Sequence, residues 1–217
     1  MALPTDVPSH DSEPPAAETP TRPGRTRLRR AAVMAVPAVA VTATMMVLTA
    51  QGALAAQFSI SGMPFTVTAD KLQGTGFEQF GGLDNMADNS PNAGSSGGQE
   101  LVVVSAIKSA TLTNLCQSVD LGGINLRITA GTGSSPVSAS HLTTDSTLVS
   151  GDASFNNIEI GGDASTFTEA GVAGPLGVFG QQADTVTINN LRQTNYATTA
   201  AVFTLPGLNL SFSDKAC

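Results

Sequence analysis

The sequence predicts an all-β exported domain that follows an N-terminal apolar signal or anchor helix. Three observations support this fold class. Residues 56–217 are rich in Gly, Ser, Thr and Asn and poor in charge, short apolar–polar alternations recur along them, and no sustained helical apolar stripe free of glycine occurs. Repeated strand-bend units favour a stacked β-roll or β-helix-like sheet, and a β-sandwich is the alternative.

The N-terminal quarter of the chain has the organisation of an export signal. Residues 1–24 are rich in Pro, Ser and Thr and predict a disordered cytosolic arm. Residues 25–55 predict a signal peptide or membrane anchor, because a basic stretch precedes the apolar run 31–50 and Ala53-Leu54-Ala55 forms a small-x-small site.

Cleavage of this signal would fall between Ala55 and Ala56. The 20 residues of 31–50 are also long enough to span a bilayer, so transient and permanent contact with the membrane both stay open. Either alternative places 56–217 outside the cell, since the arginines stay inside. We therefore expect a secreted or membrane-tethered protein whose residues 56–217 form one extracellular β-rich domain.

The charge of the exported part limits its partners. Residues 56–217 hold five basic and thirteen acidic residues, and the basic ones are scattered. An acidic surface without a basic patch repels phosphate, so nucleic acid is excluded as a partner. We expect no cofactor, and the oligomeric state is not predicted.

The two cysteines, Cys116 and Cys217, both follow the export signal. Cysteines outside the membrane normally pair, so we predict a disulfide between them, with two free thiols as the alternative. Two cysteines and the one histidine of 56–217 make no recognisable zinc site, and we predict no metal site. The acids Asp152 and Asp163 lie in loop-like stretches of the kind that can supply calcium ligands, which is the alternative to that prediction.

Strands are predicted wherever apolar and polar residues alternate between turn signals. The alternation in Phe65–Ala69 predicts a strand that follows a turn at Gly62–Pro64. Further strands are predicted at 101–107, 110–119, 124–130, 185–193, 199–205 and 208–212. The polar, Gly-rich stretches 81–100, 131–136 and 161–180 predict loops.

Three short segments share a strand-bend pattern. Segments 110–115, 153–158 and 186–191 each run small or apolar, hydroxyl, apolar, Thr or Asn, Asn, apolar. The fifth position is Asn114, Asn157 or Asn190, and Asn suits a bend because it tolerates a left-handed backbone. The alternative is a chance match, since exported β proteins reuse Thr, Val and Asn.

Several longer motifs carry a family resemblance. They are Gln51-Gly-Ala-Leu-Ala-Ala, the run from Phe65 to Phe77, Asn114-Leu-Cys-Gln-Ser-Val, Ala153-Ser-Phe-Asn-Asn-Ile, Phe179-Gly-Gln-Gln-Ala-Asp, Gln193-Thr-Asn-Tyr-Ala-Thr-Thr-Ala and the terminal cysteine. Together they resemble the DUF6230 proteins of Streptomyces and related actinobacteria. The resemblance implies an exported or membrane-associated protein of unknown function, in a family sometimes labelled cholesterol esterase.

The sequence offers one weak set of catalytic candidates. Gly94-Ser95-Ser96-Gly97-Gly98 fits the G-x-S-x-G pattern of serine hydrolases, with His141 as the base and Asp120 or Asp145 as its orienting acid. The nucleophile of an esterase lies on a sharp turn between a strand and a helix. Here the pattern lies in a Ser/Gly loop, and no helix is predicted after it. We therefore expect a non-enzymatic cell-surface protein that self-associates or binds an apolar or envelope ligand, and a lipid (cholesterol) esterase is the alternative.

Overall fold

A computed structural model describes residues 59–217, and these residues form an all-β unit built on one antiparallel sheet. The predicted signal, the span 31–50 and the cleavage site at Ala55 and Ala56 lie outside the described residues. The strands are β1 (Phe65–Asn85), β2 (Gln99–Thr113), β3 (Leu115–Asp120), β4 (Asn125–Ala130), β5 (Val137–Asn156), β6 (Glu159–Asp163), β7 (Phe179–Thr199), β8 (Val202–Thr204) and β9 (Asn209–Ser213). A single 3-10 turn, η2 (Ala164–Thr166), follows β6.

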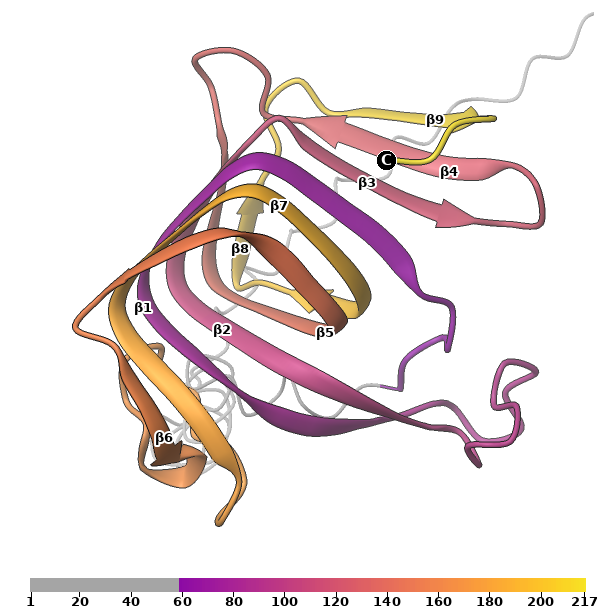
Figure 1. The fold of residues 1–217 in the computed structure, drawn as a ribbon. Coiled ribbons are helices and arrows are strands. Elements are labelled where there is room, and N and C mark those ends of the chain that lie inside the picture. The colour runs from indigo at the N-terminus through magenta and orange to yellow at the C-terminus, as the bar shows by residue number, and fades with distance from the viewer. Residues whose placement is uncertain (1–58) are drawn as a thin grey trace, which may run out of the picture. The chain divides into compact units, whose positions relative to one another are not determined.

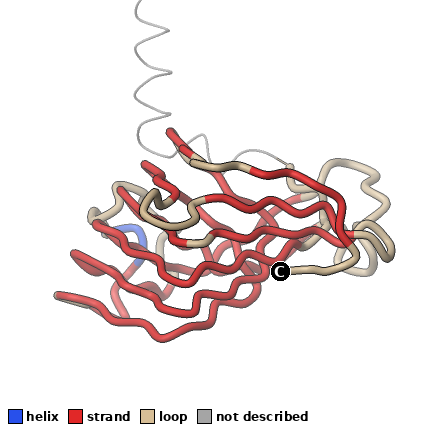
Figure 2. The backbone as a smooth tube through the Cα atoms, turned by 90° about the horizontal axis from the view of Figure 1, so that it is seen from above, coloured by secondary structure: helices blue, strands red, loops and turns tan. Residues whose placement is uncertain are grey.

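Four long strands close the sheet on itself. β1 pairs with β2 on one edge and with β7 on the other, while β5 pairs with both β2 and β7. β3, β4 and β9 extend the sheet beyond β1, and β6 and β8 add to the edges of β7 and β5. Figure 1 shows the long strands bending together around a common interior, and Figure 2 shows them lying side by side.

The strands bend where single residues, most of them not glycine, adopt a left-handed backbone. Asn114, His141, Asn157 and Asn190 all have φ between 47° and 54°, and Gly76 has φ 64°. At each bend two consecutive residues face outward. The inward-facing apolar residues therefore change from odd to even sequence positions, or back, and the same face of the strand stays inside. β1 shows this shift, since its buried positions move from Val67 and Ala69 to Leu72 and Gly74, and then to Phe77.

The bends align across strands into two corner rows. The first row contains Asn114, Asp70, Asn190 and Asp152, and the second contains His141, Lys108, Gly76, Asp184 and Asn157. In both rows a left-handed residue alternates with a neighbour on the next strand. Each left-handed Asn donates its side-chain amide to an Asp carboxylate, giving the pairs Asn114–Asp70, Asn157–Asp184 and Asn190–Asp152. The predicted bends at the three asparagines are confirmed, and the aspartates are their partners.

The interior is filled by apolar side chains from every long strand. The largest buried cluster includes Leu72, Phe77, Ile107, Val186 and Leu191. Phe77 also packs against Phe155, with ring centroids 5.3 Å apart. Toward one end the interior becomes polar, since Ser146 donates to Asn195 at 2.7 Å and Gln79 Nε2 donates to Ser105 at 2.8 Å. These buried polar groups are therefore satisfied by each other.

The all-β prediction is confirmed, but the predicted stacking is corrected. A β-helix stacks parallel coils, whereas every paired strand here is antiparallel and the one parallel contact is the isolated bridge Ile60–Met86. The β-sandwich alternative is also corrected, because one sheet closes on itself instead of two sheets packing face to face. The predicted loop 81–100 is shorter than expected, since β1 continues to Asn85 and β2 begins at Gln99.

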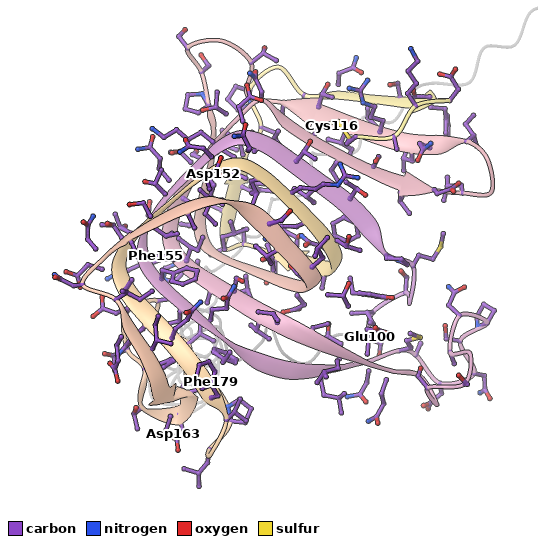
Figure 3. The ribbon with its side chains drawn as sticks, viewed as in Figure 1. Glu100, Cys116, Asp152, Phe155, Asp163 and Phe179 are labelled. Carbon is purple, nitrogen blue, oxygen red and sulfur yellow. A yellow bond between two sulfur atoms is a disulfide. The ribbon has the colours of Figure 1, made fainter. Side chains whose placement is uncertain are left out.

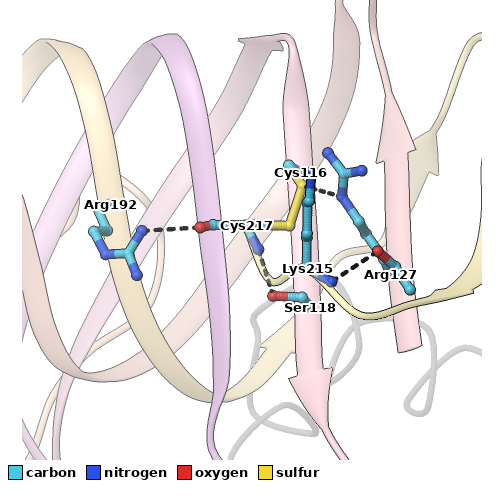
Figure 4. Close-up of a disulfide and its surroundings, with 7 residues drawn as sticks. Cys116, Ser118, Arg127, Arg192, Lys215 and Cys217 are labelled. Atoms are coloured by element: carbon cyan, nitrogen blue, oxygen red, sulfur yellow. Dashed lines mark hydrogen bonds between the residues drawn. A yellow bond between two sulfur atoms is a disulfide. The ribbon is translucent and has the colours of Figure 1, made fainter. Parts of the chain in front are cut away.

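The disulfide predicted from the cysteines is present in the structure. Cys116 of β3 bonds Cys217, closing a sequence separation of 101 residues. The terminal residue is also held by backbone contacts, because Cys217 N donates to Ser118 Oγ at 3.0 Å and Arg192 donates to Cys217 O at 3.1 Å (Figure 4). The C-terminal tail is thus fastened to both β3 and β7.

Replacing a corner asparagine should lower stability, and alanine should lower it more than glycine because the corner backbone is left-handed. We expect Asn190→Ala to lower the free energy of unfolding by about 1–2 kcal/mol, because alanine is strained in the left-handed conformation. Asn190→Gly should cost less, since it loses only the bond to Asp152. Urea unfolding measures both, and equal losses for Ala and Gly would show that φ at this corner is not the constraint.

Removing the disulfide should destabilise the protein strongly. Closing a loop of this length is worth about 4–5 kcal/mol in the chain-entropy model, so the Cys116→Ala/Cys217→Ala variant should unfold at a much lower urea concentration. Alkylation with and without reductant, followed by mass measurement, should reveal two thiols only after reduction. Two alkylated thiols in the unreduced protein would contradict the pairing.

Candidate functional site

Of Ser96, Asp120 and His141, the first two make separate local hydrogen bonds in the structure. Ser96 lies in the exposed β1–β2 loop, and its hydroxyl donates to Ala93 O at 2.9 Å. Asp120 ends β3 and accepts from the backbone N–H groups of Gly122 and Gly123, which holds its pKa below its usual range. His141 occupies a corner of β5. Within residues 59–217 no hydrogen bond joins any two of the three.

The two candidate calcium ligands are engaged in structural bonds. Asp152 accepts from Asn190 at the first corner row. Asp163 caps the 3-10 turn by accepting from Ser165 N at 3.0 Å, and it also accepts from Gly177 N. Figure 3 shows Asp152 at the bend of β5 and Asp163 near Phe179 at the other end of the sheet. In the described part of the chain no group of three or more His, Cys, Asp or Glu residues could hold a metal ion.

The interior of the closed sheet has little free space. Its cavity has a volume of about 40 Å³ and is lined mainly by apolar residues, among them Leu72, Phe77 and Ile107. Such a volume holds a few water molecules, whereas small-molecule pockets usually measure roughly 300–1,000 Å³. The free space inside the closed sheet is therefore too small for a sterol or a lipid chain.

The outer face of the sheet carries a larger, partly open cavity beneath the segment between η2 and β7. We call it the acidic cavity; its volume is about 380 Å³. Two carboxylates, Asp84 of β1 and Asp145 of β5, line it together with apolar side chains. The lining residues are Phe80, Gly82, Leu83, Asp84, Val104, Thr143, Asp145, Val172, Ala173, Gly174 and Pro175.

A third carboxylate fixes the roof of the acidic cavity. Glu78 of β1 is fully buried and accepts from the backbone N–H groups of Ala170, Gly171 and Val172, at 2.6, 3.2 and 3.3 Å. Burial raises the pKa of Glu78, and the three backbone bonds oppose this rise. The roof segment is closed at its base by the bonds of Asp163 to both ends of the loop. The cavity is thus a built feature of the fold.

The two carboxylates of the acidic cavity have no cationic partner among the described residues. Burial and the nearby Asp84 charge raise the pKa of Asp145 to about 7, and burial raises the pKa of Asp84. Asp145 is only 8% exposed and forms no side-chain hydrogen bond within 59–217. The Oδ2 atom of Asp84 is buried and equally unpaired. Among residues 59–217, no hydrogen-bond donor is therefore paired with Asp145 or with Oδ2 of Asp84.

The sequence patterns offered Asp145 only as an orienting acid for His141, and they assigned neither Asp84 nor Glu78 to a site. Asp84 lies in a stretch predicted as loop, and Asp145 lies in a Ser/Thr-rich segment without strong apolar alternation, so neither was predicted to be buried. One signal was present for Glu78, since it stands between the apolar residues Phe77 and Phe80 in a strand. The partnership of Asp84 with Asp145 depends on the pairing of distant strands, which short motifs do not encode.

Fold and site together define an all-β protein with a closed antiparallel sheet, one disulfide and an acidic cavity on its outer face. The chain belongs to DUF6230, a family of unknown function, which it matches over residues 61–217. This match confirms the resemblance seen in the sequence motifs. No curated protein and no solved structure matches the chain. The disulfide is consistent with an extracellular location, and among the described residues no helix has the length and apolar character of a membrane span.

Replacing Asp145 should flatten the pH dependence of stability. The pKa of about 7 in the folded protein lies above the ordinary 3.8, so the folded state binds more protons between these values. The free energy of unfolding must then fall as pH rises through this window, by about 4 kcal/mol for the full shift.

We expect Asp145→Asn to remove most of this slope and to stabilise the protein at pH 8. Urea unfolding at several pH values measures it. The matched control is Asp214→Asn, which changes an exposed acid in the tail and should leave the slope intact. An unchanged slope in Asp145→Asn would show that Asp145 is ionised freely in the folded state.

Proposed function

We propose that this chain is an exported, non-catalytic protein of the actinobacterial cell surface that binds an amine-bearing envelope ligand in the acidic cavity. The observation that carries the proposal is the pair Asp84 and Asp145, two carboxylates in one cavity with no basic side chain among residues 59–217 to neutralise them. Export of residues 56–217, by a cleaved signal or with a retained anchor, supplies the location.

The chemistry of the cavity favours an ammonium group with an apolar stem. A primary ammonium donates three hydrogen bonds, and its positive charge would offset the negative charge of the two carboxylates. The side chains of Phe80, Val104 and Val172 provide apolar walls for the carbon atoms beside it. Amino sugars, diamino acids and ethanolamine headgroups all share this ammonium chemistry.

The cavity also has the size and construction of a small-molecule site. Its volume of about 380 Å³ falls in the range of ligand pockets, and its roof is held by the buried Glu78. A preformed roof reduces the entropy lost on binding. Binding of an envelope component in this cavity therefore requires no rearrangement of the sheet.

Calorimetry with hexylammonium and its neutral isostere hexanol tests the proposal. We expect hexylammonium to bind the intact protein and hexanol to bind much more weakly. The affinity for hexylammonium should rise from pH 5 to pH 8, because Asp145 loses its proton in this range. Asp145→Asn should weaken binding by about 30-fold or more, the loss of roughly 2 kcal/mol expected when one partner of a buried charge pair is removed.

Asp214→Asn serves as the matched control and should bind as the unaltered protein does. Equal binding of hexanol and hexylammonium would show that the cavity recognises the apolar stem alone. Unchanged binding in Asp145→Asn would place the ammonium site elsewhere. Either result contradicts the proposed function.

A further inference from the structure

The outer face between the two corner rows carries a regular array of hydroxyl and amide side chains. The array has two rows that each cross five strand segments, and we call it the hydroxyl wall. One row is Ser140, Ser109, Thr75, Thr185 and Asn156, and the other is Ser138, Thr111, Gln73, Thr187 and Ser154. Each neighbour in a row is the direct cross-strand partner of the next.

A shallow trough runs between the two rows. Gly74, Ala110 and Val186 form its floor, because these residues point into the core and leave only backbone and small atoms facing outward. The hollow has a volume of about 490 Å³ and is bordered by Gln73, Thr75, Ser109, Thr111, Asn156, Thr185 and Thr187. No apolar or aromatic side chain projects from either row.

Charge is confined to the margins of the hydroxyl wall. Asp70 and Asp152 belong to the first corner row, and Lys71 follows Asp70 at that margin. Lys108 and Asp184 belong to the second row. The two rows between them are uncharged. The wall therefore suits a neutral partner rich in hydroxyl groups, which exchanges its hydrogen bonds to water for bonds to Ser, Thr, Asn and Gln.

We infer that the hydroxyl wall binds an extended β-1,4-linked glycan chain lying in the trough across the strands. Neighbouring strands are about 4.8 Å apart, close to the repeat of sugar rings in such a chain, so each ring meets one strand. The ribbon of sugar rings carries hydroxyl groups on both edges, and a row of side chains lies along each edge of the trough. Many weak bonds then add along the chain.

This surface is separate from the acidic cavity. The hydroxyl wall lies between the corner rows, whereas the cavity residues Phe80, Gly82 and Asp84 follow the second corner of β1. Glycan binding at the wall therefore does not depend on ammonium binding in the cavity, and each can be tested in the other's absence.

Calorimetry of the disulfide-bonded protein with cello-oligosaccharides and fully N-acetylated, uncharged chito-oligosaccharides of increasing length tests the inference. We expect the affinity to rise with length and to reach a plateau at about five sugars, the number of strand segments in a row. Preference for one series would distinguish a glucan from an amino-sugar polymer as the source. Absence of binding in both series, or affinity that is independent of length, would overturn the inference.

Two variants locate the binding surface. Thr75→Arg places a bulky charge beside the trough and should weaken binding at least tenfold, whereas Ser211→Arg on β9 is the matched control and should have no effect. Thr75→Val/Thr111→Val removes one hydroxyl from each row with little change of shape and should weaken binding severalfold. Full binding in Thr75→Arg would overturn the inference. So would inhibition of ice growth by a protein that binds neither glycan series, because the array would then have another role.

Discussion

The left-handed corners are the constraint on which the whole structure depends. A straight strand of the length of β1 would span about 70 Å and could not close a sheet around a small core. Each corner turns the strand and shifts its apolar positions by one, so the same face remains inside. The cost of a left-handed backbone is offset at Asn114, Asn157 and Asn190 by a bond to an aspartate on the adjacent strand.

The corners also divide the outer surface into parts with different chemistry. Before the first corner, the outer face carries the disulfide and the fastened tail. Between the corners it carries the hydroxyl wall, and beyond the second corner of β1 it carries the roofed acidic cavity. Because the interior is filled, the outer face of the sheet is the part whose side chains can be altered without changing the core.

Local features of the sequence predicted local features of the structure. Asn in a strand pattern has few uses other than a bend, so the corner asparagines were identifiable. The expected extracellular location of the cysteines predicted the bond between Cys116 and Cys217. The closure of the sheet was not predictable, because alternation identifies strands but does not say which ones pair. β5 was predicted only at its end, within segment 153–158. Its first part was missed because the buried residues there include Thr143, Thr144 and Asp145, whose polarity conceals their burial.

The two buried acids on the outer face have different physical explanations. Glu78 is buried because three backbone N–H groups of the roof replace the water that its carboxylate loses. Asp145 receives no such compensation from residues 59–217, and the charge of Asp84 adds to its cost. An uncompensated buried carboxylate lowers stability. A ligand that supplies a cation and hydrogen-bond donors would remove this cost, and ammonium chemistry supplies both.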